Sequence, residues 1–441
     1  MANGISVPNR INSTGSHLLE DYETMSIDPR NYTGQSVLVL GRGNAGFEVA
    51  KSIYGHAAYV ILHGRSRVRL SWDTHYVGDI RQIQSFLLLF HGYNHLVGVN
   101  NELLDSYMLK ALDGLLRTNL PTMSFVTSNK KIHIRPEKMV GISAVRFGFD
   151  RIIQCLGFYW DSSIFINDPH PTSSKPLKKY PLIKNNYESE KYDDLYFAGT
   201  NTHSLDYRKA AGGFIHGFRY TVQALHRLLE WKDHKEPWPH VQINYGDIPV
   251  MLIKRANEAS GIYQMFSTLG DVIIADHTSR TAKYLTDYPI KLLPQLANQT
   301  GHSVEVESTF VFVLLMEYGY EYSKPGRDAF KGTLAPEPRE AHDSEFLHPV
   351  IWAYRQLPTE VDMQNLKNQG TLPKPDGIHH VLADFTTDFD APFEYFQPLR
   401  RFVENFLGTD VRSCTEESCF GMVLCSYSLP SCCERYASAI I

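Results

Sequence analysis

The clearest pattern in the chain is a run of four apolar residues that leads into a glycine-rich turn and then into a segment with helical spacing. The apolar run, residues 37–40, predicts a buried strand. The turn over residues 41–46 reads Gly-Arg-Gly-Asn-Ala-Gly, and residues 47–53 place apolar side chains on one helical face. We therefore predict a strand, a tight turn and a helix, in that order.

The same patterns predict further elements along the chain. Apolar runs predict strands over residues 58–63, 149–157 and 195–200, and helical spacing predicts helices over residues 102–112, 208–230 and 399–407. Strands that alternate with helices are typical of a parallel sheet. The fold class that we predict is α/β, with a doubly wound Rossmann-type domain first and a mixed α+β region after it.

The glycine turn has the spacing that a dinucleotide pyrophosphate requires. Gly41 would allow the tight turn, Gly43 would let the backbone approach the phosphates, and Gly46 would let the helix pack closely on the strand. Asn44 and Ala45 belong to the same turn, and the N–H groups and dipole of the helix that follows would face the anion. The alternative is a plain strand–turn–helix connection without a ligand.

The residues after the second predicted strand favour NADP over NAD. A site for NAD usually has a carboxylate there to accept a hydrogen bond from the ribose 2′-hydroxyl. This chain instead has Arg65, Ser66 and Arg67, and guanidinium groups suit a 2′-phosphate. The alternative is a solvated basic loop.

A second candidate site follows the strand over residues 195–200. Gly199 and Thr200 end that strand, and Gly212 lies in the small-residue start of the next helix. Glycine at such places lets the backbone come close to a cofactor, here a flavin. The alternative is an ordinary glycine-containing connection between a strand and a helix of a doubly wound sheet, without a ligand.

Composition sets further limits on the function. The 441 residues carry a formal net charge of −5, which gives no reason to expect a nucleic-acid partner. No apolar run approaches the ~20 residues that span a bilayer. Five of the six cysteines crowd the C-terminal end without C-x-x-C spacing, so we predict neither a dithiol centre nor a metal site. We expect Cys155 to be a buried, inert thiol.

The residues do not identify a catalytic acid or base. His75, His203 and His216 lie in distinctive motifs, but we expect each of them to be a hydrogen-bonded structural histidine.

Several long motifs together resemble a known family. They are residues 41–48, 66–72, 74–79, 204–220, 257–266 and 346–351. They are similar to the endoplasmic-reticulum flavoproteins associated with degradation, a family of FAD-dependent oxidoreductases. A more distant resemblance is to the superfamily of flavin monooxygenases and pyridine-nucleotide oxidoreductases.

The resemblance implies a domain organisation and two cofactors, FAD and NADP. The implied parts are a connector from a FAD-binding domain (1–33), an NADP-binding domain (34–165), a returning FAD-binding segment (166–235) and a family-specific C-terminal region (236–441). The FAD pyrophosphate motif that the family carries earlier is not in the sequence. We therefore expect the chain to begin inside the fold and to bind FAD poorly. Residues 82–97 look like an insertion.

The resemblance also implies a function and a location. NADPH would reduce the flavin, which would then reduce a further acceptor, and the alternative is a client-binding adaptor that has lost its flavin. The implied partners are misfolded glycoprotein clients and components of endoplasmic-reticulum-associated degradation, and the implied location is the endoplasmic-reticulum lumen. The glycosylation sequons at Asn31 and Asn298 are compatible with that location.

Overall fold

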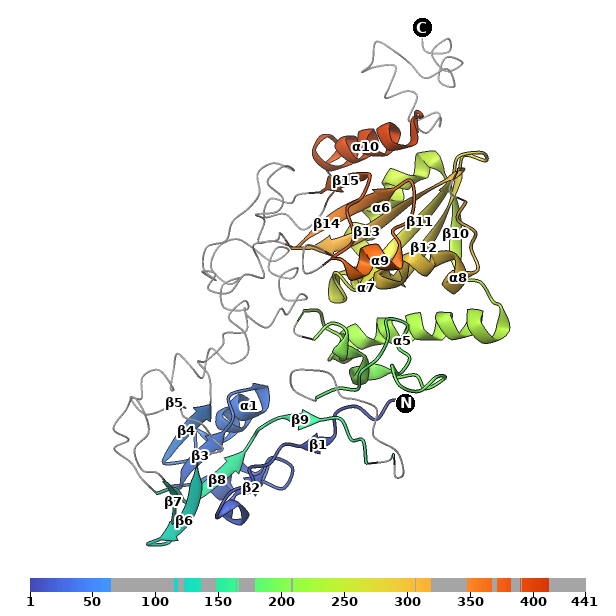
Figure 1. The fold of residues 1–441 in the computed structure, drawn as a ribbon. Coiled ribbons are helices and arrows are strands. Elements are labelled where there is room, and N and C mark those ends of the chain that lie inside the picture. Colours follow the sequence, from blue (N-terminus) through green and yellow to red (C-terminus); the bar gives the residue numbers. More distant parts are fainter. Residues whose placement is uncertain are drawn as a thin grey trace. The chain divides into compact units, whose positions relative to one another are not determined.

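The computed structural model describes residues 1–64, 115–117, 123–135, 148–163, 165, 179–207, 209–305, 307–318, 347–366, 371–381, 389 and 391–411. The chain divides into two compact units, Ala2–Leu182 and Ile183–Ile441, and Met1 belongs to the second. Figure 1 shows the elements of both units.

The first unit is built on a parallel sheet. Its strands lie in the order β2-β8-β3-β4-β5, and every described neighbouring pair is parallel. The elements of this unit are β1 (Val7–Pro8), η1 (Ser16–Leu18), β2 (Glu20–Asp21), η2 (Pro29–Tyr32), β3 (Ser36–Leu40), α1 (Asn44–Ile53), β4 (Tyr59–Gly64), β5 (Leu115–Arg117), β6 (Ser124–Ser128), β7 (Lys131–Arg135), β8 (Arg151–Gln154) and β9 (Phe158–Tyr159). The strand–turn–helix prediction is confirmed.

The two faces of the parallel sheet are covered by different structures. On one face Val37 and Val39 of β3 pack with Phe47 and Ile53 of α1. On the other face Leu38 and Leu40 pack with Phe125 and Ile134, which belong to the antiparallel hairpin of β6 and β7. A doubly wound sheet has helices on both faces, so the described part of this unit departs from that prediction. The hairpin can take the place of a helix on this face because its residues Phe125 and Ile134 cover the apolar side chains of β3.

The second unit is built on an antiparallel sheet with the strand order β10-β12-β11-β13-β14-β15. Its strands are β10 (His240–Asn244), β11 (Leu269–Asp276), β12 (Thr281–Pro289), β13 (Thr309–Glu317), β14 (His348–Tyr354) and β15 (Gly377–His380). Its helices are η6 (Gly199–Ser204), α5 (Ile215–Leu229), η7 (Glu230–His234), η8 (Tyr245–Asp247), α6 (Ile248–Glu258), α7 (Ser260–Gln264), η9 (Ile290–Gln295), α8 (Leu296–Thr300), α9 (Glu360–Gln364), η12 (Pro392–Phe396) and α10 (Gln397–Leu407). The mixed α+β prediction for this part is confirmed.

Many of the large aromatic residues that the structure describes in the second unit build its core. Trp238, Tyr284, Tyr288 and Phe312 are among the largest fully buried side chains. Helix α10 covers part of the sheet through Phe406, whose ring meets that of Phe312 edge-on at a centroid distance of 5.3 Å. The aromatic content of this region therefore reflects packing.

A buried ion pair holds α6 on this sheet. The Asp271 side chain has no exposed surface, and it accepts hydrogen bonds from Arg255 Nε (2.6 Å) and from the Tyr284 hydroxyl (2.9 Å). The Asp287 backbone N–H donates to the same carboxylate at 2.9 Å. Burial and the nearby charge of Asp271 raise the pKa of Asp287 to about 6.

Two predicted elements differ from the structure. The strand predicted over residues 195–200 is reduced to one bridge between Glu188 and Tyr196, and η6 begins at Gly199. The helix predicted from residue 208 begins at Ile215, because the Asp206 carboxylate binds the Gly212 N–H and holds the preceding residues in a turn. The helix predicted over residues 102–112 and the insertion predicted at residues 82–97 lie outside the described residues.

The predicted boundary at residue 235 falls inside the second unit. Helix α5 packs on β12, and Arg227 Nη1 donates to the Thr286 carbonyl at 2.7 Å. The returning segment and the C-terminal region thus share one compact unit from Ile183 onward. None of the helices among the described residues has the length and apolar character needed to cross a bilayer.

We expect Asp271→Ala to destabilise the second unit strongly. The change removes the nearer carboxylate partner of the half-buried Arg255 guanidinium and leaves Asp287 Oδ1 at 3.9 Å, and breaking such a buried pair typically costs about 3–5 kcal/mol. Urea unfolding measures the loss, with Asp233→Ala, at an exposed aspartate of the same unit, as the matched control. The control should change the unfolding free energy by less than about 0.5 kcal/mol. Equal effects of the two substitutions would contradict the importance of the ion pair.

Candidate functional site

The turn after β3 is shaped by a close backbone approach at Gly41. Its φ is +119°, and a Cβ at this position would lie 2.0 Å from the Cys155 carbonyl oxygen. The Gly41 N–H donates to the His63 carbonyl at 2.8 Å, and the Cys155 N–H donates to the Leu40 carbonyl at 2.7 Å. The carboxyl ends of β3, β4 and β8 are therefore joined at this residue, which only glycine fits.

Gly46 brings the first turn of α1 against that same backbone. A Cβ on Gly46 would lie 2.4 Å from the Gly41 carbonyl oxygen. The helix thus begins directly at the strand end, which is the close helix–strand packing that dinucleotide sites use.

Gly43 lies on the open side of the turn. It is exposed, it is the N-cap of α1, and an added Cβ would meet no heavy atom within 4 Å. Asn44 is exposed too, Ala45 is half-buried, and the first helical turn contains no acidic residue. A phosphate approaching this turn would meet the positive end of the helix dipole and no carboxylate from that turn.

Arg42 places a cation at the end of β4. Its guanidinium lies across Gly64, where an added Cβ would be 2.4 Å from Arg42 Nε. Burial, together with the charge of Arg42, lowers the pKa of His63 to about 4. His63 is therefore neutral at pH 7, and the fixed positive charge at this strand end belongs to Arg42.

Arg42 is a candidate that sequence reasoning missed. The predicted 2′-phosphate residues, Arg65, Ser66 and Arg67, lie outside the described residues and stay predictions. The strand end that Arg42 covers is the place where a dinucleotide site distinguishes NAD from NADP. The available signal was an arginine as the second residue of the turn, but sequence alone does not give the direction of its side chain.

Cys155 is the buried thiol that we predicted. It is 6% exposed and unpaired, and burial raises its pKa to about 12. A thiol with that pKa is protonated at pH 7 and a poor nucleophile.

The second candidate site lies in the second unit, between η6 and α5. Gly199 has a φ of +69° and open space where a Cβ would be, and Thr200 follows it as the next residue of η6. Gly212 is buried, and an added Cβ would lie 2.4 Å from Asp206 Oδ1. The structure thus places the three predicted residues on one connection into α5.

A buried carboxylate organises this connection. Asp206 is 2% exposed, its Oδ2 accepts the Gly212 N–H at 2.8 Å, and its Oδ1 lies 2.9 Å from His203 Nδ1. The expectation that His203 is a hydrogen-bonded histidine agrees with this contact. His216 is exposed and stacks on Phe214, and His75 lies outside the described residues.

The residues of this connection fit a flavin. The hydroxyls of Ser204 and Tyr187 are buried without a protein hydrogen-bond partner, so both are available to a ligand or water. Phe214 and Ile215, at the start of α5, are 42% and 74% exposed. Apolar surface beside a helix start without acidic residues suits an aromatic ring that becomes anionic when reduced. Among the described residues no cluster of three metal-ligating side chains occurs.

Sequence comparison identifies two relatives that match nearly the whole chain. FAD-dependent oxidoreductase domain-containing protein 2 of Mus musculus is 43% identical over 456 aligned positions, which cover 99% of this chain and 66% of that protein. The protein of the same name from Danio rerio is 36% identical and is covered to the same extent, 66%. The chain thus spans about 66% of the length of these relatives. No family model matches the chain.

Solved structures overlap with the chain only loosely. The HOCl-induced flavoprotein disulfide reductase of Escherichia coli has a TM-score of 0.31 and 9% identity, over 84% of this chain and 66% of that one. The bacillithiol disulfide reductase of Bacillus cereus has a TM-score of 0.30 and 12% identity, over 45% and 52% of the two chains. The family assignment therefore uses the sequence relatives. By their identity and extent, the chain is a homologue of FAD-dependent oxidoreductase domain-containing protein 2 and belongs to this flavoprotein family.

Proposed function

We propose that the protein is an oxidoreductase that uses NADPH and FAD. The observation that carries the proposal is the turn over residues 41–46, where an exposed Gly43 caps α1 at the carboxyl edge of a parallel sheet. This edge is where open α/β sheets bind their ligands. Membership of the FAD-dependent family supports a redox use of that nucleotide.

In the first unit, the described residues would bind the nucleotide and select it. The N–H groups at the start of α1 would face the pyrophosphate, with Gly43 leaving room for its approach. Arg42, together with the predicted Arg65 and Arg67, would hold the 2′-phosphate, and the neutral His63 would contribute no charge to that contact.

In the second unit, Gly199, Thr200 and the start of α5 would hold the flavin. When bound, FAD supplies hydride acceptance and onward electron transfer. The chain's own part is placement and electrostatics. Asp206 fixes the turn through Gly212, and the positive end of the α5 dipole lies at the start of that helix, which contains no acidic residue in its first turn.

We propose the endoplasmic-reticulum lumen as the location, and misfolded glycoproteins and degradation components as partners. Both proposals rest on the family resemblance of the motifs described above. Co-immunoprecipitation of a tagged chain from fractionated cells tests them, and recovery of the chain only from the cytosolic fraction would contradict the location.

Gly43→Val should abolish nucleotide binding without unfolding the protein, because the added side chain enters open space that the pyrophosphate needs. Gly41→Val should instead destabilise the first unit, since its Cβ would meet the Cys155 carbonyl. NADPH fluorescence titration and thermal unfolding separate the two effects. Wild-type affinity in Gly43→Val would refute the site.

Arg42→Ala should weaken NADP⁺ binding much more than NAD⁺ binding. Loss of one charge-assisted contact to the 2′-phosphate costs about 1.5–3 kcal/mol, roughly a tenfold to hundredfold loss of affinity. The double variant of Arg65 and Arg67 should show the same preference, and Arg30→Ala, at an exposed arginine of the same unit, is the control. Equal losses for the two nucleotides would remove Arg42 from this role.

NADPH oxidation tests the redox proposal directly. We expect the purified chain to carry little flavin, but to oxidise NADPH faster than NADH when FAD is added in excess. Free FAD without protein and the Gly43→Val variant give the background rates. A chain that oxidises neither nucleotide at saturating FAD would favour the adaptor hypothesis.

A further inference from the structure

The second unit contains a cavity that the redox chemistry does not use. Its volume is about 310 Å³, and it is lined by residues of the returning segment, of the end of α5 with η7, and of α8. This volume is near the lower end of the ~300–1,000 Å³ typical of small-molecule sites. The cavity therefore has room for one small ligand, and a dinucleotide would not fit.

Two aromatic side chains form part of the wall, and one of them is held rigidly. Trp231 Nε1 donates to the Asn298 carbonyl at 2.7 Å. The benzo ring of Trp231 lies against Gly301, where an added Cβ would be 2.5 Å from the ring. Tyr196 is the second aromatic residue of the wall. Rigid aromatic side chains offer apolar surface at a low cost in conformational entropy.

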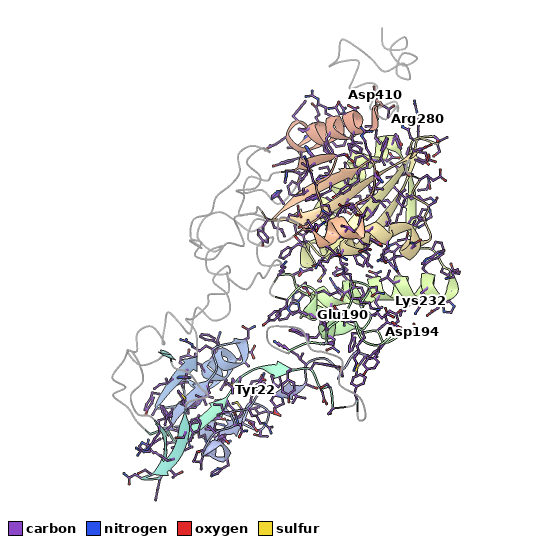
Figure 2. The ribbon with its side chains drawn as sticks, viewed as in Figure 1. Tyr22, Glu190, Asp194, Lys232, Arg280 and Asp410 are labelled. Carbon is purple, nitrogen blue, oxygen red and sulfur yellow. The ribbon has the colours of Figure 1, made fainter. Side chains whose placement is uncertain are left out.

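The charges around the cavity are largely neutralised by one another. Lys232 bonds to Asp194 and to the Tyr196 hydroxyl, and Figure 2 shows Lys232 and Asp194 next to each other. Glu188 accepts a hydrogen bond from Lys184 at 2.8 Å. A ligand entering the cavity would therefore meet little uncompensated charge.

Lys235 is the remaining charged residue of the wall. Its amine donates to the Lys232 carbonyl at 3.0 Å and lies 5.5 Å from the centre of the Trp231 ring. Lys235 thus packs beside the Trp231 ring and helps to hold it in place. Because Lys235 is positively charged, a small anion is the main competing ligand for the cavity.

Three amide-bearing residues also line the cavity, Asn186, Asn298 and Gln299, and Asn186 Oδ1 accepts the Glu188 N–H at 3.2 Å. An amide both donates and accepts hydrogen bonds, so it matches a hydroxyl group, which does the same. Asn298 is exposed at the surface, whereas Gln299 is fixed by a hydrogen bond to Gln295 at 2.9 Å.

We propose that this cavity binds a pyranose sugar. A sugar ring presents C–H groups on its faces, which pack on aromatic rings, and hydroxyls on its rim, which pair with amides. It is uncharged, which suits a wall where Lys232 and Glu188 already have ion-pair partners. The sugar could belong to another molecule, or to a glycan carried by Asn298 itself, whose sequon lies on the wall.

Saturation-transfer NMR on the full chain, produced in bacteria and therefore without glycans, tests the proposal. The probes are N-acetylglucosamine, mannose and glucose, with inorganic phosphate as the competing anion. We expect at least one sugar to bind saturably with a Kd on the order of 1 mM. Trp231→Ala should weaken that binding roughly tenfold, and Trp231→Phe should restore most of it.

Two further variants guard against a merely structural effect. Asn186→Ala removes a wall amide without touching the tryptophan, and should also weaken sugar binding. Val241→Ala changes an exposed residue elsewhere in the unit and should leave binding unchanged. Sugar binding that is unaffected by both Trp231→Ala and Asn186→Ala would overturn the assignment to this cavity.

The outcomes of the titrations are distinct. Absence of saturable binding by any of the three sugars would overturn the proposal, as would phosphate binding that depends on Lys235 in place of sugar binding. Chain secreted from mammalian cells then distinguishes the two sources. If the occupant is the chain's own glycan, added sugar should bind the bacterial chain but not the glycosylated one, whereas a site for other molecules binds sugar in both forms.

Discussion

The close approach of the Gly41 backbone to the Cys155 carbonyl is the contact on which the first unit depends. At this point β3, β4 and β8 end together, and Gly46 presses the start of α1 against the same backbone. A side chain at Gly41 would clash with the Cys155 carbonyl, and one at Gly46 would push the helix off the end of β3. The geometry leaves Gly43 and Asn44 of the turn open to solvent, so the steric demands that build the turn also leave it accessible to an anion.

In the second unit, the contacts that matter most fix the connection into α5 and hold α6 on the antiparallel sheet. The buried carboxylates of Asp206 and Asp271 do this in two ways. Asp206 binds a backbone N–H and so fixes a turn, whereas Asp271 binds a guanidinium and so anchors α6. Both carboxylates are almost fully buried, and each has its oxygens satisfied by the chain, as burial of a charge requires.

Sequence reasoning succeeded where structure is determined by neighbours along the chain. The turn over residues 41–46 and helix α10 are local patterns, and both are found as predicted. The strand predicted over residues 195–200 was wrong because an apolar run that ends in glycine also suits an extended segment that pairs at a single residue, here Tyr196. The β6–β7 hairpin on the second sheet face and the position of Arg42 over Gly64 depend on three-dimensional contacts that periodicity does not encode. For the same reason sequence reasoning found the turn but missed one residue of the candidate site.

The parallel sheet also has a consequence for folding kinetics. Strand β8 pairs with β3, and Gln154 bonds to Asp21, 133 residues away along the chain, whereas β11 and β12 form a hairpin from neighbouring residues. Pairing of distant strands requires closure of a long loop before any contact is gained, which makes it slow. We therefore expect the antiparallel sheet to form early and the strand ends around Gly41 to assemble late, so that the turn proposed to bind the nucleotide is among the last parts of the newly made chain to form.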